Sequence, residues 1–422
     1  MNHNLSVNKL EPVMLQNSSE RNCMQEEIRL FPSNIPDFSK IPGLNKTQGQ
    51  SSQLSYQENA ADAADETEED GRIQFLHHAE SLLLPRFELN DMDHPAVKEI
   101  FRLAKLCLAE RLAYNPKPNL QTIRRSNTKR HGEILFGKNR NCKQPAGRIE
   151  LNLEELDHLS LPELVLEIQE AMLDPKYTAA TMAGIMENYP GISRRLLKVV
   201  NSSFYNLPLK IEDVFQAATI LGSKRISILV QGLTIRSVFR EIAPSSMDIN
   251  KFWNHSMACA IAARAMGAAK RGLNNERLFI AGLLHDAGRL ILKEKFPEFM
   301  SLAENKAVYE RKAKHLSEQE IIGMDHAEAG GLLVSKWKFS LILEQIISCH
   351  HEPALSVHPV ETAIVHVADV LTNACSGNIE CKENIPPLDP YAWEILKLDP
   401  AVFSPCLRRI ERVLGQNCQT SK

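Results

Sequence analysis

The chain has 422 residues, 43% of them hydrophobic and only 6% aromatic, with a net charge of −3. This length allows two or three domains, and the composition suits a helical core built from aliphatic side chains. The small charge argues against nucleic-acid binding by bulk charge, and nine scattered cysteines argue against a disulfide scaffold. Because no apolar run approaches a membrane span and no signal-peptide core begins the chain, we expect a cytoplasmic protein without membrane contact.

The first 150 residues differ in composition from the rest. Residues 1–71 are rich in Ser, Asn, Gln and Glu and close on an acidic run, which predicts a disordered tail. Residues 72–150 are expected to hold a helical segment and then a basic linker. Residues 120–148 contain eight Arg and Lys residues but only one acidic residue, Glu133. A solvated linker is the favoured interpretation, and a phosphate or nucleic-acid contact through residues 122–148 is the weaker alternative.

From about residue 155 onward, apolar residues recur at helical spacing almost without interruption, and no stretch alternates long enough to predict a strand. The fold class is therefore predicted to be all-α, a bundle of many helices. We expect one domain over residues 155–376 and a C-terminal helical cap over residues 377–422. The predicted helices lie near residues 161–173, 178–188, 191–202, 211–221, 223–239, 249–270, 276–295, 297–313, 325–337, 340–352, 359–376, 390–397 and 400–414.

The most informative stretch is Leu278–Leu292, which is almost entirely apolar and is predicted to be a buried helix. Two adjacent ionisable residues, His285 and Asp286, lie in its middle. Burying an imidazole and a carboxylate without partners costs several kcal/mol of folding free energy. The rest of the chain must therefore supply either polar partners or ligands that complete a metal site.

Four other predicted helices offer such ligands from apolar surroundings. Each histidine alone is more often a satisfied core residue than a ligand, but the ordered set favours a metal site. Imidazoles with carboxylates suit Fe or Mn first, and also Zn, Co or Ni, and one carboxylate can bridge two ions. The predicted metal ligands are His255, His285, Asp286, His326, His350 and Asp369.

The other histidines near this set are assigned different roles. On one helix, His350 and His351 would point about 100° apart, so both are not expected to bind the same ion in the same way. His315, His358 and His366 fall outside the pattern and are interpreted as structural or exposed. The paired Gly330 and Gly331 after His326 are expected to let the backbone approach another helix closely.

Residues 160–353 closely resemble the HDOD domain, the HD-related output domain of bacterial signalling proteins. Four stretches carry the resemblance: Ser160-Leu-Pro-Glu-Leu, the segment ending in Asn201-Ser202-Ser203, Ala217-Ala-Thr-Ile-Leu-Gly222, and Ala281-Gly-Leu-Leu-His-Asp-Ala-Gly. The resemblance implies the all-helical HD-superfamily bundle, continuing through Asp369.

The resemblance implies two opposed functions. The wider HD superfamily contains metal-dependent phosphohydrolases, and its HD-GYP branch hydrolyses cyclic di-GMP with a second metal. HDOD proteins are generally regarded as relatives that have lost ligands and act as non-catalytic modules. In this sequence His255, His285, Asp286 and Asp369 match the first-metal set, while His326 and His350, with Asp286 as the bridge, match the second.

The chain also departs from the catalytic branch. The Gly-Tyr-Pro signature is replaced by Glu352-Pro-Ala-Leu, and Arg289 stands where HD-GYP enzymes have Lys. Arg289 could bind phosphate or form a structural salt bridge, and the sequence does not choose between them.

Two hypotheses for the function follow. The favoured hypothesis is a regulatory output module that contacts other signalling proteins, with a bound metal centre. The alternative is a metal-dependent phosphohydrolase of a nucleotide or cyclic nucleotide, in which Asp286 bridges two ions and Arg289 or His351 stabilises charge.

Overall fold

The protein is described from a computed structural model that covers residues 72–114, 151, 156, 159, 161–201, 209–242, 247–376 and 383–414. These residues form helices and connecting segments and contain no β-strand, so the predicted all-α class is confirmed. The predicted disordered tail, the predicted basic linker and parts of the predicted C-terminal cap lie outside the described residues.

The chain divides into two compact units. Among the described residues, the first unit holds a helix over residues 72–83 and the end of α3 (Pro95–Tyr114) from Lys105 onward. Leu76, Leu83 and Leu108 are buried there, and the Lys105 Nζ atom lies 3.8 Å from Glu80 Oε2. The helical segment expected after residue 72 is therefore present.

The second unit contains the predicted site and begins with η2 (Leu84–Phe87) and the first half of α3. Its next helices enclose an apolar core that includes Ile168, Met182, Leu196 and Ile226. These helices are α6 (Glu163–Leu173), α7 (Ala179–Glu187), α8 (Pro190–Val200), α9 (Val214–Leu221) and α10 (Ser223–Ile242).

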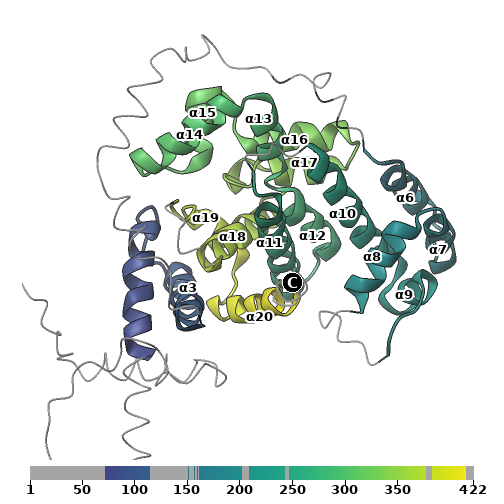
Figure 1. Cartoon of the computed structure of the whole chain (residues 1–422), viewed down its shortest axis with the longest axis horizontal. Helices are drawn as coiled ribbons and strands as arrows, with labels where there is room; N and C mark the ends of the chain where they lie inside the picture. Colours follow the sequence, from purple (N-terminus) through teal and green to yellow (C-terminus); the bar gives the residue numbers. More distant parts are fainter. Residues whose placement is uncertain are drawn as a thin grey trace, which may run out of the picture. The chain divides into compact units, whose positions relative to one another are not determined.

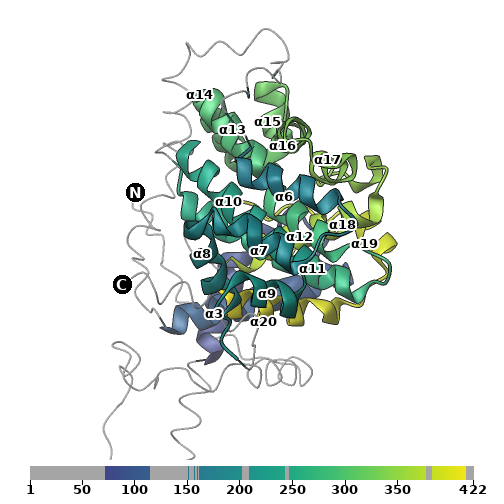
Figure 2. The same ribbon diagram turned by 90° about the vertical axis from the view of Figure 1, so that its right-hand side faces the viewer.

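Among the remaining helices of this unit, α11 (Ile249–Ala269) packs along α12 (Asn275–Leu284) and α18 (Pro359–Cys375), and it also contacts α20 (Phe403–Leu414) (Figures 1 and 2). Alanines on α11, among them Ala260 and Ala263, are buried and permit this close packing. The other elements are α13 (Ala287–Lys295), α14 (Pro297–Glu310), α15 (Lys314–Ile322), α16 (His326–Lys336), α17 (Leu341–Ser348), η4 (Pro353–Leu355), α19 (Pro390–Leu396) and η5 (Pro400–Val402).

Capping side chains fix where the helices that carry the site begin. The Asp248 carboxylate accepts hydrogen bonds from the backbone N–H groups of Asn250 and Lys251 at the start of α11. Asp325 accepts one from Glu328 N at the start of α16, which makes His326 the first residue of that helix. These bonds satisfy backbone donors that have no partner within the helix, so the sequence itself sets the position of His326.

Three predicted helix boundaries are wrong. The helix expected over residues 276–295 breaks at His285 and Asp286, where Asp286 adopts φ −93° and ψ 3°. The helix expected over residues 297–313 ends at Glu310, because Arg311 takes the left-handed conformation, and the unpredicted helix α15 follows. The helix expected over residues 340–352 ends at Ser348, so His350 and His351 lie in a turn and the 100° argument does not apply to them.

Within the described residues, none of the helices combines the length and the apolar character needed to cross a membrane.

Candidate metal centre

The six predicted ligands converge on one cluster. His255 lies on α11, His285 and Asp286 lie between α12 and α13, and Asp369 lies on α18. His326 opens α16, and His350 follows α17. Three overlapping groups of ligand atoms, each spanning at most 4.8 Å, hold these residues: His255, His285 and Asp286; His285, His350 and Asp369; and His326, His350 and His351.

The first part of the cluster pairs two imidazoles with two carboxylates. His255 Nε2 lies 3.0 Å from Asp369 Oδ1 and 3.7 Å from Asp286 Oδ2. His285 Nε2 lies 3.3 Å from the same Asp369 oxygen and 3.7 Å from Asp286 Oδ1. The sequence predicted this grouping, and the tertiary structure brings all four side chains together.

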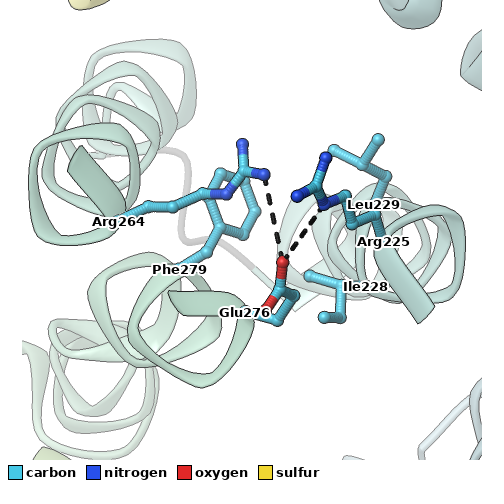
Figure 3. A pocket seen from close by; sticks show the side chains of 6 residues that line it. All are labelled: Arg225, Ile228, Leu229, Arg264, Glu276 and Phe279. Carbon is cyan, nitrogen blue, oxygen red and sulfur yellow. Dashed lines mark ion pairs between the residues drawn. The ribbon is translucent and has the colours of Figure 1, made fainter. Parts of the chain in front are cut away.

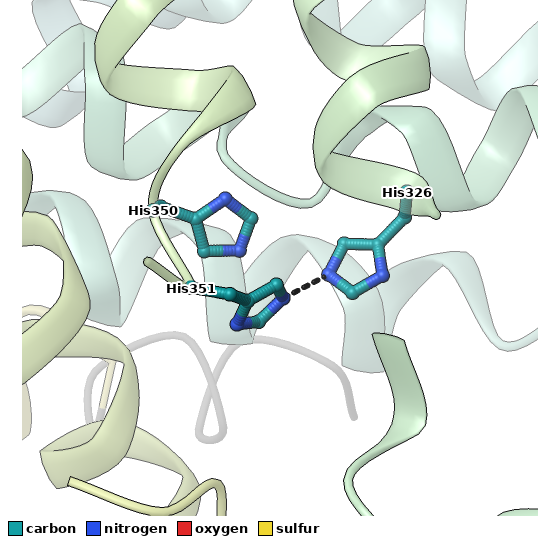
Figure 4. A group of neighbouring side chains, drawn as sticks. All are labelled: His326, His350 and His351. Atoms are coloured by element: carbon teal, nitrogen blue, oxygen red, sulfur yellow. Dashed lines mark hydrogen bonds between the residues drawn. The ribbon is translucent and has the colours of Figure 1, made fainter. Parts of the chain in front are cut away.

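The second part consists of three imidazoles that face one another (Figure 4). The Nε2 atoms of His326 and His351 are 2.8 Å apart, and the rings of His350 and His351 lie 3.9 Å apart between centroids. His351 therefore lies beside two predicted ligands and offers a nitrogen to the same group, a role that the predicted helix geometry had argued against. The turn after α17 brings both neighbouring histidines to one side.

Asp286 lies between the two parts. Its Oδ2 atom faces His255, while its Oδ1 atom is 3.1 Å from His326 Nε2. Burial would raise the pKa of the Asp286 carboxyl, but Arg289 and His285 beside it hold that pKa well below its usual range. Asp286 is thus an ionised carboxylate that lies beside histidines of both parts, because Oδ1 is near His326 and His285 and Oδ2 is near His255. A bridging ligand requires such contact with both parts.

The hydrogen bonds of His285 and His350 leave the same nitrogen free on each ring. His285 Nδ1 lies 2.8 Å from the Gly282 carbonyl, and His350 Nδ1 lies 2.8 Å from the Ile347 carbonyl. Since a carbonyl only accepts, both Nδ1 atoms donate, and in the neutral form of each ring the lone pair is then on Nε2. Burial holds the pKa of His350 well below its usual range, so His350 is in this neutral form. Neither Nε2 atom makes a hydrogen bond although both are buried. His285 Nε2 still faces the carboxylates of Asp369 and Asp286, whereas the buried lone pair of His350 Nε2 is costly unless a cation uses it.

Two residues that the sequence analysis did not select orient the cluster from outside. Glu318 on α15 accepts from the backbone N–H of His326 at 2.9 Å and contacts its Nδ1 at 2.5 Å. Burial alone would lower the pKa of His326, but the Glu318 carboxylate helps raise it to about 9. Asn373, one turn after Asp369, donates to Asp369 Oδ1 at 2.7 Å. No sequence pattern selects Glu318, although Asn373 stands at the helical i+4 spacing from Asp369.

Arg289 is already engaged in this structure. Its Nε atom lies 3.2 Å from Asp286 Oδ1, and its side chain is 22% exposed. Of the two roles that the sequence left open for Arg289, the ion pair with Asp286 is the one present here.

The histidines left outside the pattern differ from one another. His366 is buried, its Nδ1 donates to the His350 carbonyl at 2.9 Å, and its Nε2 accepts from Asp389 N at 2.9 Å. Both of its nitrogens are occupied, so His366 is structural. His315 instead stacks on His351 with ring centroids 4.1 Å apart. Burial and the nearby His326 lower the pKa of His315 to about 4.

Close backbone contacts hold the helices that carry the ligands. A Cβ atom added at Gly288 of α13 would lie 2.0 Å from the His326 carbonyl oxygen. One added at Gly282 of α12 would lie 2.8 Å from Ala260 Cα on α11. Gly330 contacts Gly288 in the same region, as the paired glycines predicted. The positions of His285 and Asp286 therefore depend on contacts that only glycine permits.

Comparison with known proteins identifies the family of the helical domain. Residues 159–353 match the HDOD domain. This part of the chain belongs to the HDOD domain family, as the sequence motifs predicted.

Two solved structures share the fold. One is a Shewanella amazonensis SB2B protein named for a suggested phosphohydrolase activity; it is 20% identical, with a TM-score of 0.51 over 63% of this chain and 96% of that chain. The other is a Marinobacter aquaeolei VT8 protein named for a suggested role in signal transduction; it is 19% identical, with a TM-score of 0.54 over 69% and 66% of the two chains.

A curated relative from Treponema pallidum (strain Nichols), described as an uncharacterized protein, is 23% identical over 234 residues. That match covers 55% of this chain and 44% of the relative, so this chain spans less than half the length of the relative.

Proposed function

We propose that this protein is a regulatory output module of signal transduction whose HDOD domain binds a divalent transition-metal centre. The observation that carries the proposal is the pair of buried Nε2 atoms of His285 and His350, neither of which makes a hydrogen bond, beside the carboxylates of Asp286 and Asp369. Four such groups meeting in a protein interior are costly without a cation.

The donor set fits such a metal. Neutral imidazoles and ionised carboxylates are ligands that Fe, Mn, Zn, Co and Ni accept, and Fe or Mn agrees best with this mixture. One ion would be held by His255, His285, Asp286 and Asp369, and a second by Asp286, His326, His350 and His351. A bound divalent ion supplies Lewis-acid character and lowers the pKa of coordinated water.

Burial supports a regulatory role over a catalytic one. His285, His326 and His350 have no exposed surface, and Asp286 is 3% exposed. Arg289, the cation best placed to bind a substrate phosphate, is paired with Asp286. We infer that the centre stabilises one arrangement of α11–α18, which other signalling proteins would then contact. The match to a solved structure named for signal transduction agrees with this proposal.

A metal-dependent phosphohydrolase of a nucleotide or cyclic nucleotide is the second candidate. One specific observation favours it: the Asp286 carboxylate lies within 3.7 Å of histidines of both groups, as a carboxylate that bridges two ions would. In that case His351, the partly exposed imidazole of the second group, and Arg289 would contact the substrate phosphate.

Elemental analysis of the protein, purified without added metal and under anaerobic conditions, tests the proposal. We expect about one or two transition-metal ions per chain in the wild type and a large loss in Asp286→Ala. The matched control is His358→Gln, because His358 lies in the same region of the chain but belongs to none of the ligand groups. A wild-type protein without stoichiometric metal, or an Asp286→Ala variant that keeps its metal, would overturn the proposed centre.

Assays of the metal-loaded protein then separate the two candidates. Absence of turnover with a panel of nucleotides, cyclic nucleotides and phosphodiesters supports the regulatory role. Turnover that is lost in Asp286→Ala and retained in His358→Gln would instead support the phosphohydrolase.

A further inference from the structure

The strap, residues 383–389, is a non-helical segment between α18 and α19. It is bound to η2 at the start of the second unit. The Ile385 backbone N–H donates to the Arg86 carbonyl at 2.8 Å, and Arg86 Nε donates to the Glu383 carbonyl at 3.2 Å. Ile385 has no exposed surface, and Leu388 is also buried. Contacts to a distant part of the chain therefore hold the strap in place.

The side-chain amide of Asn90, just after η2, makes three more bonds to the strap. Asn90 Nδ2 donates to the carbonyls of Ile385 and Pro386 at 3.3 and 3.4 Å. Asn90 Oδ1 accepts from the Leu388 backbone N–H at 3.0 Å. Because Pro386 and Pro387 have no N–H group, this part of the strap cannot pair as a regular helix or strand. One asparagine therefore satisfies several of its backbone groups.

The C-terminal end of the strap is connected to the second group of candidate ligands. The Asp389 backbone N–H donates to His366 Nε2 at 2.9 Å, and His366 Nδ1 donates to the His350 carbonyl at 2.9 Å. His366 is buried, so water does not readily replace either bond. Two hydrogen bonds in series thus join the strap to the backbone of a candidate metal ligand.

A second connection runs to the first group of candidate ligands. Arg86, which holds the strap, also has its Nη2 atom 3.5 Å from the Asn373 carbonyl on α18. Asn373 Nδ2 donates to Asp369 Oδ1 at 2.7 Å. The residue that anchors the strap therefore contacts the residue that orients a candidate carboxylate ligand.

The charge at the N-terminal end of the strap acts on the cluster as well. Glu383 forms an ion pair with Lys314 on α15. Burial would lower the pKa of Arg289, but nearby carboxylates raise it, Asp286 most strongly and Glu383 among them. Arg289 Nε in turn lies 3.2 Å from Asp286 Oδ1. Glu383 and Asp286 thus attract the same guanidinium group.

We propose that the strap couples the occupancy of the metal centre to the anchoring of η2 and α3. The coupling rests on the proposed centre. With the centre filled, Asp369 and His350 are held in one arrangement, which is costly to maintain while these buried groups lack a cation. The strap then docks on partners that are already ordered, so less conformational entropy is lost. Because α3 continues into the first unit, the strap connects the centre to the helix that both units share.

Hydrogen exchange of the full-length wild-type protein, metal-free and metal-loaded, tests the coupling without any substitution. We expect the peptide that covers the strap to exchange about fivefold or more slowly with metal bound. The internal control is α9, which contacts α7, α8 and α10; none of these helices carries a candidate ligand, and the exchange of α9 should not change. Equal exchange of the strap in both forms would overturn the coupling.

Asn90→Ala tests the same coupling from the side of the strap. Because coupling is reciprocal, a loosened strap should weaken metal binding by about fivefold in competition with a chromogenic chelator. A shift of this size changes Kd without emptying a site that holds its metal stoichiometrically, so affinity and not metal content is the readout. The matched control is Asn384→Ala, because Asn384 belongs to the strap but makes none of these bonds. Wild-type metal affinity in an Asn90→Ala protein whose strap exchanges faster would overturn the proposal.

A second control loosens ligand-bearing helices at a place remote in sequence from the strap. Glu276 on α12 lies 3.4 Å from Arg225 on α10 and 4.0 Å from Arg264 on α11 (Figure 3). Ion pairs this long between partly exposed side chains contribute little, so Glu276→Gln should keep the wild-type metal Kd and strap exchange. A fivefold loss of metal affinity in Glu276→Gln would make the effect of Asn90→Ala unspecific and overturn the coupling.

The two proposals fail in different ways. Protein that holds stoichiometric metal but shows no response of the strap overturns the coupling and leaves the metal centre standing. Protein without metal in the elemental analysis overturns both.

Discussion

Gly288→Ala is the sharpest test of how the cluster is assembled. The new methyl group would lie 2.0 Å from the His326 carbonyl oxygen and 2.6 Å from Gly330 N. Both atoms belong to the backbone of α16, so no side-chain rotation relieves the clash. Normal contact needs roughly 1 Å or more of additional separation, which moves α13 away from α16.

The energetic cost follows from this displacement. Overpacking a close-packed interior costs about 1–3 kcal/mol, and a backbone clash this short belongs at the upper end. The higher helix propensity of alanine returns at most about 1 kcal/mol. We therefore expect Gly288→Ala to lower the free energy of unfolding by about 2 kcal/mol. Asp286 precedes α13 and His326 opens α16, and Asp286 Oδ1 lies 3.1 Å from His326 Nε2. Separating the two helices would move these two predicted ligands apart, so metal affinity should fall as well.

Urea unfolding followed by circular dichroism measures the change, and Gly184→Ala is the control. Gly184 lies within α7, and a Cβ atom there would meet no heavy atom within 4 Å. That variant should be about 0.5–1 kcal/mol more stable than the wild type, through helix propensity alone. Equal stability of Gly288→Ala and the wild type would refute the close-packing argument for the site.

Three further outcomes are expected. Glu318→Gln, which replaces the carboxylate that orients His326 with an amide, should weaken metal binding by about 10–100-fold in competition with a chromogenic chelator, and unchanged affinity would contradict the orienting role. His366→Phe leaves the His350 carbonyl and Asp389 N without their partner, so it should cost about 2–3 kcal/mol in urea unfolding. The metal content of His366→Phe should stay at the wild-type level. If this variant lost its metal while keeping the stability of the wild type, His366 would instead be a metal ligand. Removing metal with a chelator should lower the unfolding free energy by about 2.7 kcal/mol relative to protein held at a hundredfold excess of metal over Kd. Asp286→Ala should show no such difference, and an equal response in both proteins would place the metal elsewhere.

The sequence by itself determined the helical architecture and most of the cluster. Helical periodicity and capping are local signals, so the start of α16 at His326 could be predicted from the residues around it. The adjacent His285 and Asp286 in an apolar stretch demanded partners, and the structure brings the other predicted ligands to them. That inference needed only the cost of burying charge, which does not depend on the details of packing.

Only the tertiary structure decided which atoms meet. The break between α12 and α13 and the turn after α17 change the directions of His285, Asp286, His350 and His351. Hydrogen bonds to carbonyl groups determine which imidazole nitrogen is free, and Glu318 reaches His326 from a helix that periodicity did not predict. These features depend on contacts between segments distant in the chain, and hydrophobic spacing within one segment carries no information about them.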